Sequence, residues 1–267
     1  MNNTILLVMA LTFIIGTIGT LAYSVRIVGV KTGRIAVAFS VFNILALVSR
    51  TANVIQAPLL TKTIEKRIEH GNATELLGLF RGMLLTGTFA AIFGALLLPT
   101  FIKVFTKAVT AFSTYRSIPK VIIHGFSKAG IEQFKASISI PNRSNFSQLT
   151  KYKTISKRIM VLNVIAGSIS SVGVMASLYA ACLNPSLRAT CTNLSSVINS
   201  GATILLFIFI DPYMSMLTDD VVKGECTELI FNRTVIFIVW GQIIGTLLAQ
   251  FILVPSAYII SYIAKLI

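Results

Sequence analysis

The sequence predicts an all-α fold: a polytopic membrane protein whose six transmembrane helices are arranged as two inverted three-helix repeats. Three observations lead to this prediction, namely the composition, the apolar segments and an internal repeat. Of the 267 residues, 55% are hydrophobic and only 12% are charged, and the mean hydropathy is +0.83. Such a chain has too little polar surface to cover a water-soluble domain, so we expect the bilayer to be its solvent.

The apolar segments set the number of helices. A spanning helix needs roughly 20 apolar residues to cross about 30 Å of hydrocarbon. The segments that meet this requirement are residues 4–23, 35–60, 76–104, 159–183, 195–216 and 234–263. The first segment lacks a basic n-region and is longer than the roughly 7–15 residues of a signal-peptide core, so we expect it to be retained as the first helix.

The basic residues predict the orientation. If the connecting segments alternate between the two sides, 16 of the 23 Lys and Arg residues lie on one side and five on the other. The positive-inside rule then places both termini outside and residues 106–158 in the cytoplasm. These cations also fit anionic lipid head groups, so the formal net charge of +14 does not indicate nucleic acid binding.

Residues 106–158 form the longest connection between predicted helices. Apolar residues recur at helical spacing among lysines and arginines near its start, and a stretch rich in Ser, Lys and Asn follows; the apolar positions are Ala108, Val109, Phe112, Tyr115 and Ile118. This pattern is typical of an interfacial amphipathic helix. We interpret the segment as a basic amphipathic cytoplasmic linker at the lipid surface, with capture of a substrate as the alternative.

The internal repeat relates the two halves of the chain. Residues 71–77 resemble residues 224–230, at a shift of 153 residues. Other landmarks recur in the same order, pairing Pro58 with Pro212, Arg81 with Arg233 and Pro99 with Pro255. The prediction is therefore a first three-helix repeat in residues 1–105 and a second in 159–267. Three spans per repeat invert the second copy, as in carriers with two access states. Chance recurrence of short motifs is the alternative.

Polar residues inside the apolar segments indicate a binding site. Arg50 lies about 15 Å inside the second span, where facing lipid would cost at least about 3 kcal/mol. Asn43, Arg50 and Asn53 share one helical stripe, which Gln56 borders, and Arg81 lies early in the third span. Two guanidinium groups with few acids nearby fit an anion, so we predict these five residues as substrate-binding. Hydrogen bonding between helices is the alternative role.

No catalytic or metal-binding motif is recognisable. Cys182, Cys191 and Cys226 have no C-x-x-C spacing, and pairing of Cys182 with Cys191 stays open. His70 and His124 belong to no zinc motif, and there is no phosphate-binding glycine loop or nucleophile elbow. We therefore predict no metal, no cofactor and no enzymatic activity.

The six-span layout, the segment ILALVSRTANVIQAP at residues 44–58 and residues 71–81 together resemble the Amj family of bacterial lipid II flippases, alternates to MurJ. The resemblance covers essentially the whole chain. It implies alternating-access transport of the undecaprenyl-pyrophosphate-linked peptidoglycan precursor from the inner to the outer leaflet of the bacterial cell membrane.

On this interpretation Arg50, supported by Asn53, Gln56 and Arg81, attracts the pyrophosphate, since arginine matches phosphate oxygens. Two groups of three helices make a small carrier. We therefore consider a homodimer in which the second copy completes the cavity. The alternatives are a small-ion or small-solute carrier, a non-transporting membrane scaffold for cell-wall synthesis and, last, an intramembrane enzyme.

Overall fold

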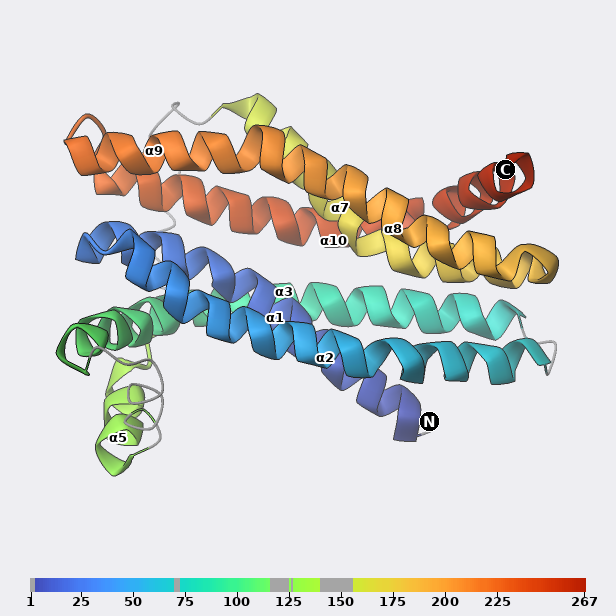
Figure 1. Cartoon of the computed structure of the whole chain (residues 1–267), viewed down its shortest axis with the longest axis horizontal. Helices are drawn as coiled ribbons and strands as arrows, with labels where there is room; N and C mark the ends of the chain where they lie inside the picture. Colours follow the sequence, from blue (N-terminus) through green and yellow to red (C-terminus); the bar gives the residue numbers. More distant parts are fainter. Residues whose placement is uncertain (1–2, 70–72, 116–124, 126, 140–155) are drawn as a thin grey trace.

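The computed structural model describes residues 3–69, 73–115, 125, 127–139 and 156–267 (Figure 1). Within these ranges the regular elements are all helical. They are α1 (Asn3–Thr32), α2 (Ile35–Glu69), α3 (Ala73–Tyr115), α5 (Lys128–Ser137), α7 (Lys157–Leu183), η1 (Pro185–Leu187), α8 (Arg188–Leu205), η2 (Leu206–Ile210), α9 (Asp211–Lys223) and α10 (Glu228–Leu266).

Six helical stretches of the described chain are long and apolar enough to cross a membrane, which confirms the predicted six-helix membrane fold. The fifth stretch combines η1, α8, η2 and α9 into one span, Pro185–Lys223. Each helix continues beyond the apolar segment that predicts it. Hydropathy marks only the part of a helix inside the hydrocarbon, whereas the backbone hydrogen bonds carry the helix past the lipid boundary.

The amphipathic pattern after residue 105 needs a correction. Residues 106–115 continue α3 instead of starting a separate interfacial helix, and Val109 is fully buried against Val25, Val28 and Phe105. The apolar periodicity there thus marks a helix face that packs against α1. Ile118 and most of residues 116–155 lie outside the described residues. A linker function for this segment stays a prediction.

Helix α5 is the described remnant of the long connection. Its N-cap Ser127 accepts a hydrogen bond from the backbone N–H of Gly130 at 3.2 Å. Beyond its other end, Ser139 donates its backbone N–H to Thr100 Oγ1 at 3.0 Å, and Lys107 Nζ lies 3.0 Å from Ser137 Oγ. These contacts hold α5 against the last turns of α3 (Figure 1).

The helices pack as two groups with the same internal pattern. In the first group, α1 packs against both α2 and α3; in the second group, α7 packs against both α8 and α10. The groups meet through α3 with α10, α1 with α10, and α3 with α7. The least buried spans are α2 and the α8–η2–α9 span, one in each group.

Close backbone approach holds each group together. A Cβ on Gly94 of α3 would lie 2.7 Å from Thr20 Cβ of α1, and a Cβ on Gly245 of α10 would lie 2.9 Å from the Val164 carbonyl oxygen of α7. Small residues that let two helices approach are the common device of membrane helix packing, because lipid gives no hydrophobic drive for helix association. The same device thus serves both groups.

A π-helical turn interrupts the fifth span. Residues Leu206–Ile210 form this turn directly before Asp211 and Pro212, with which α9 begins. Proline has no N–H to donate to the preceding turn, and a wide turn absorbs this local break without ending the helix. Pro212 therefore lies within the span, which continues to Lys223.

Candidate functional site

A cavity of about 310 Å³ lies between the two helix groups. It is lined by residues of α1, α3, α7 and α10, and its polar lining consists of Thr12, Thr20, Ser171, Gln242 and Thr246, together with Tyr23. The remaining lining is apolar or glycine, and no charged residue is among these described lining residues. We call it the central cavity. Its chemistry suits neutral polar groups more than a bare charge.

One ion pair joins the two groups toward the C-terminal end of α1, which we call the Arg26 end. Arg26 Nη2 of α1 donates to Asp211 Oδ1 of α9 at 2.5 Å. The same guanidinium lies over the ring of Phe39 on α2, 6.0 Å from its centroid. Arg26 is six residues before the end of α1, so the pair lies about 9 Å inside the helix terminus.

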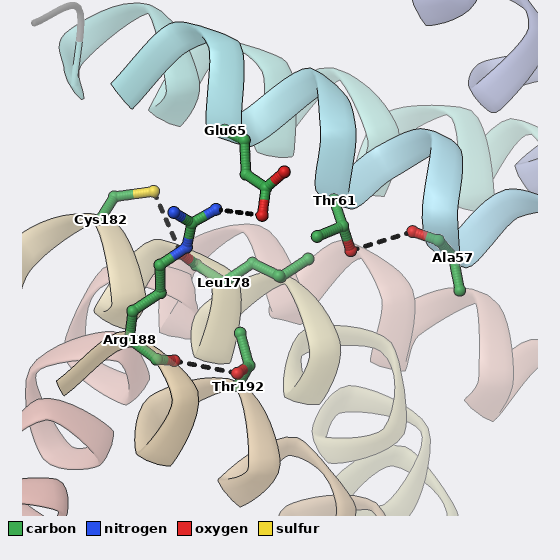
Figure 2. A network of polar contacts seen from close by, with 7 residues as sticks. All are labelled: Ala57, Thr61, Glu65, Leu178, Cys182, Arg188 and Thr192. Carbon is green, nitrogen blue, oxygen red and sulfur yellow. Dashed lines mark hydrogen bonds and ion pairs between the residues drawn. The ribbon is translucent and has the colours of Figure 1, made fainter. Parts of the chain in front are cut away.

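A second ion pair joins the groups at the opposite end of the bundle, which we call the Arg188 end. Figure 2 shows Arg188, the first residue of α8, reaching Glu65 near the end of α2, with Nη2 and Oε1 separated by 2.8 Å. The neighbouring Cys182 thiol donates to the Leu178 carbonyl oxygen at 3.1 Å and thus stays within its own helix. Each end of the described bundle therefore carries one arginine–carboxylate pair between the groups.

A second opening, of about 320 Å³, lies at the Arg26 end, between α1, α3 and α10. Lys31, Asn232, Arg233 and Glu228 give it polar walls, and the rest of its lining is apolar. We call it the Lys31 pocket. Sequence reasoning placed Lys31 and Arg233 among the loop cations that set orientation. The one available signal was the equivalence of Arg233 with Arg81 in the repeat.

The structure does not bring the five sequence-predicted residues together in the central cavity. Asn43, Arg50 and Asn53 lie on the exposed side of α2, where Asn53 Nδ2 donates to the Ser49 carbonyl oxygen of its own helix at 3.2 Å. Within the described chain, Arg50 makes no ion pair. The expected stripe exists on the helix, but in the single chain it faces outward. None of the three lines the central cavity.

Gln56 and Arg81 are placed differently from the other three. Gln56 is buried, and its Nε2 donates to the Val8 carbonyl oxygen at 3.2 Å and to Thr12 Oγ1 at 2.5 Å. Its amide thus ties α2 to α1 beside the central cavity. Arg81 is exposed on α3, and its backbone carbonyl accepts a hydrogen bond of 3.0 Å from Gln250 Nε2 of α10.

The cysteines and acids of the described residues make no metal cluster. Cys182, Cys191 and Cys226 are free thiols, the first two buried and the third part-exposed. No group of three or more His, Cys, Asp or Glu side chains in the described ranges could hold a metal ion. Burial raises the pKa of the Cys226 thiol above its ordinary value, and the negative charge of Asp220 raises it further.

Two comparisons with known proteins agree over nearly the full chain. The family described as "Amj: Alternate to MurJ" matches residues 11–264. The "Lipid II flippase Amj" of Bacillus subtilis (strain 168) is 35% identical over 266 residues, which cover 99% of this chain and 98% of the relative. No solved structure matches the chain. By the extent of both matches, the chain belongs to the Amj family.

Proposed function

We propose that this chain is a lipid II flippase that moves the undecaprenyl-pyrophosphate-linked peptidoglycan precursor from the inner to the outer leaflet of the cell membrane. Family membership over residues 11–264 carries the proposal, together with the name of the relative from Bacillus subtilis. The six apolar helices fit a protein that works inside the bilayer. The function is transport, without a chemical step.

Alternating access between two inverted repeats is the mechanism we favour. The two groups share one packing pattern and are joined by one ion pair at each end, Arg26–Asp211 and Glu65–Arg188. In inverted repeats such paired contacts exchange roles when the groups rock against each other. Breaking one pair would open one end of the central cavity while the other pair keeps the opposite end closed.

The size of the central cavity supports a closed arrangement of the two groups. A volume of about 310 Å³ is at the lower limit of ligand pockets, which span roughly 300–1,000 Å³ for drug-sized molecules. A head group with two sugars and a pentapeptide is larger than such molecules. The groups must therefore separate for this head group to pass. Hydroxyl and amide side chains of the lining suit its sugars and peptide bonds.

The exposed polar face of α2 supports a homodimer. A guanidinium facing lipid near the bilayer midplane costs at least about 3 kcal/mol, so the Arg50 side chain needs a polar partner. Arg50 lies near the middle of α2 and is exposed together with Asn43 and Asn53. A second copy or the lipid-linked pyrophosphate supplies that partner. Substrate attraction by Arg50, with Asn43 and Asn53, stays part of the proposal on this basis. Gln56, buried against α1, and Arg81, exposed on α3, stay in the proposed set from the sequence prediction alone.

The orientation completes the proposal. The excess of Lys and Arg places the Arg26 end and residues 106–158 in the cytoplasm and both termini outside. Exposed cations at that end, among them Lys31, Lys103 and Lys223, fit the anionic lipids of the inner leaflet. The substrate then enters from the leaflet at the Arg26 end and leaves at the Arg188 end.

A cavity-filling substitution tests the proposal. Gly87 of α3 lines the central cavity and a Cβ there would meet no atom within 4 Å, so Gly87→Leu places its side chain in the cavity. We expect purified wild-type protein in liposomes to flip labelled lipid II, and Gly87→Leu to lower the rate at least about tenfold. The matched control is Gly78→Leu, on the same helix, exposed and away from the cavity, which keeps the rate.

The outcomes separate the alternatives. Wild-type protein that moves small ions or solutes but no lipid II would favour the small-solute carrier, and protein that moves nothing would favour the scaffold. Unchanged flipping in Gly87→Leu would remove the central cavity from the path. In the same assay, unchanged flipping in Arg50→Ala would remove Arg50 from the binding residues.

A further inference from the structure

The Lys31 pocket combines two kinds of lining in one small space. Its apolar wall consists of Ile27, Leu98, Pro99, Ile102, Leu229 and Ile236. Its polar side carries the Lys31 ammonium, the Arg233 guanidinium and the Asn232 amide, with Glu228 as the acid of the set. Two basic residues and one acidic residue give the lining a formal net positive charge. A ligand that fits must be both apolar and anionic.

Arg233 is the group that makes this pocket unusual. It is an arginine within a spanning helix, and only 6% of it is exposed. Arginine binds phosphate oxygens in a bidentate manner through its planar fork of N–H donors. A nearly buried Arg233 on the wall of an opening is therefore a preorganised donor for a phosphate group.

Lys31 and Asn232 complete the donor set from two sides. Lys31 is an exposed residue in the last turn of α1, whereas Asn232 adjoins Arg233 on α10. An ammonium group on a flexible stem reaches a phosphate as a point charge and does not require one fixed geometry. Donors from α1 and α10 thus converge on one space whose third wall is α3.

We propose that the Lys31 pocket binds the prenyl pyrophosphate part of the substrate before translocation. Arg233, Lys31 and Asn232 bind the phosphate oxygens, and the apolar wall takes the first isoprene units. This inference rests on the proposed function for the identity of the substrate and deepens it by naming a loading site. The pocket lies at the Arg26 end, where that function places entry from the cytoplasmic leaflet.

The pocket and the Arg26–Asp211 pair belong to the same end of α1. Ile27 and Lys31 of the pocket are on the helix that carries Arg26, one residue and five residues further on. A ligand that draws Lys31 and Arg233 together acts on α10 and on α1, the helix that also carries Arg26. Loading of the pocket is thereby positioned to precede opening of the Arg26 end.

Binding of a short prenyl pyrophosphate to the purified full-length protein tests the proposal. The probe is farnesyl pyrophosphate in detergent, measured by titration calorimetry, with farnesol and inorganic pyrophosphate as separate arms. We expect farnesyl pyrophosphate to bind more tightly than either part alone. Lys31→Gln, at an exposed position, and Arg233→Lys, which keeps the charge but loses the fork, should each weaken binding about tenfold.

Lys223→Gln is the matched control, since it removes an exposed cation at the same end of the bundle but outside the pocket. It should bind like the wild type. Equal weakening in Lys223→Gln and Lys31→Gln would overturn the proposal, because general surface charge would then explain the binding. Wild-type affinity in both pocket variants would also overturn it. Inorganic pyrophosphate that binds as tightly as the prenyl compound would remove the apolar wall from the site.

Flipping of lipid II in liposomes separates this inference from the proposed function. If the wild type binds farnesyl pyrophosphate through Lys31 and Arg233 but flips no lipid II, the pocket stands and the flippase function fails. If the wild type flips lipid II and both pocket variants flip at the same rate, the function stands and the loading site fails.

Discussion

The two ends of the bundle carry the same kind of ion pair in different surroundings. The Arg26 and Asp211 side chains are 20% and 40% exposed, and the Arg26 guanidinium also lies over the Phe39 ring. The Arg188 and Glu65 side chains are 35% and 49% exposed. A more exposed ion pair is weaker, because solvent screens the two charges and because holding two mobile side chains in one geometry costs rotamer entropy.

This difference in exposure predicts that the two ion pairs differ in strength. A half-exposed pair such as Glu65–Arg188 contributes about 0.2–1 kcal/mol, whereas breaking a charged hydrogen bond in a more enclosed place costs about 3 kcal/mol. The Arg26 end should therefore be the harder end to open, and the Arg188 end the easier one. For a carrier that loads at the Arg26 end, the difficult step would then be the entry of the substrate.

Labelling of Cys226 gives an all-or-none test of which side of the membrane the Arg26 end faces. Cys226 lies between α9 and α10 at the Arg26 end, and the other two cysteines are buried. We expect a membrane-impermeant maleimide to label cells only after permeabilisation. Because the thiolate reacts and the Cys226 pKa is raised, labelling should increase about tenfold per pH unit near neutral pH.

Cys226→Ser should remove all labelling. Labelling of intact cells would instead place the Arg26 end outside, and the Lys31 pocket would then face the wrong leaflet for loading.

The next largest effect is expected from Arg26→Glu. This substitution puts two carboxylates opposite each other and should lower the free energy of unfolding by about 3 kcal/mol and the flipping rate at least about tenfold. The exchanged pair, Arg26→Glu with Asp211→Arg, should recover most of the lost free energy of unfolding and most of the lost flipping rate. Thermal unfolding in detergent and lipid II flipping in liposomes measure the two quantities. An exchanged variant no better than Arg26→Glu would show that the pair itself is not what matters.

A substitution in the middle of the bundle should lower the free energy of unfolding less than Arg26→Glu does. Gly245→Val places a side chain against the Val164 carbonyl, 2.9 Å from the new Cβ, and should cost about 2 kcal/mol by overpacking. Gly201→Val on α8, where a Cβ meets nothing within 4 Å, is the control and should be close to neutral. Unfolding midpoints in detergent compare them. Equal midpoints would mean that α7 and α10 can separate at little cost.

The smallest effect is expected at the Arg188 end. Arg188→Gln removes the half-exposed pair with Glu65 and should lower the free energy of unfolding by less than about 1 kcal/mol. The flipping rate should change about twofold at most. If Arg188→Gln destabilises the protein as much as Arg26→Glu in parallel unfolding experiments, the two ends are equally strong and the comparison is wrong.

The sequence predicts the helices well because hydropathy is a local property. Six apolar segments give six spans, but the ends are missed, as at Tyr115, since a helix continues wherever its backbone bonds and packing allow. Val109 shows what the sequence does not contain. It belongs to an apolar repeat that the sequence shows, whereas the surface that it packs against is visible only in the structure.

The candidate site depends on tertiary contacts and is predicted less well. The sequence predicts that Gln56 supports Arg50, and only the position of Val8 and Thr12 on a neighbouring helix shows where its amide is used. Arg26 and Asp211 are 185 residues apart, so no local spacing connects them. The sequence pairs Arg233 with Arg81 early in a helix and also counts it among the cations that set orientation, but its burial in α10 follows only from the packing of neighbouring helices.

The π-helical turn Leu206–Ile210 has a consequence for the helical wheel of the fifth span. A π turn holds one residue more than an α turn, and one residue corresponds to a rotation of about 100° around the helix axis. The faces of α8 and α9 therefore cannot be drawn on one wheel, and a stripe that starts among the serines of α8 does not continue to Asp211. Removing a single residue from this turn would rotate Asp211 away from Arg26 without altering either side chain.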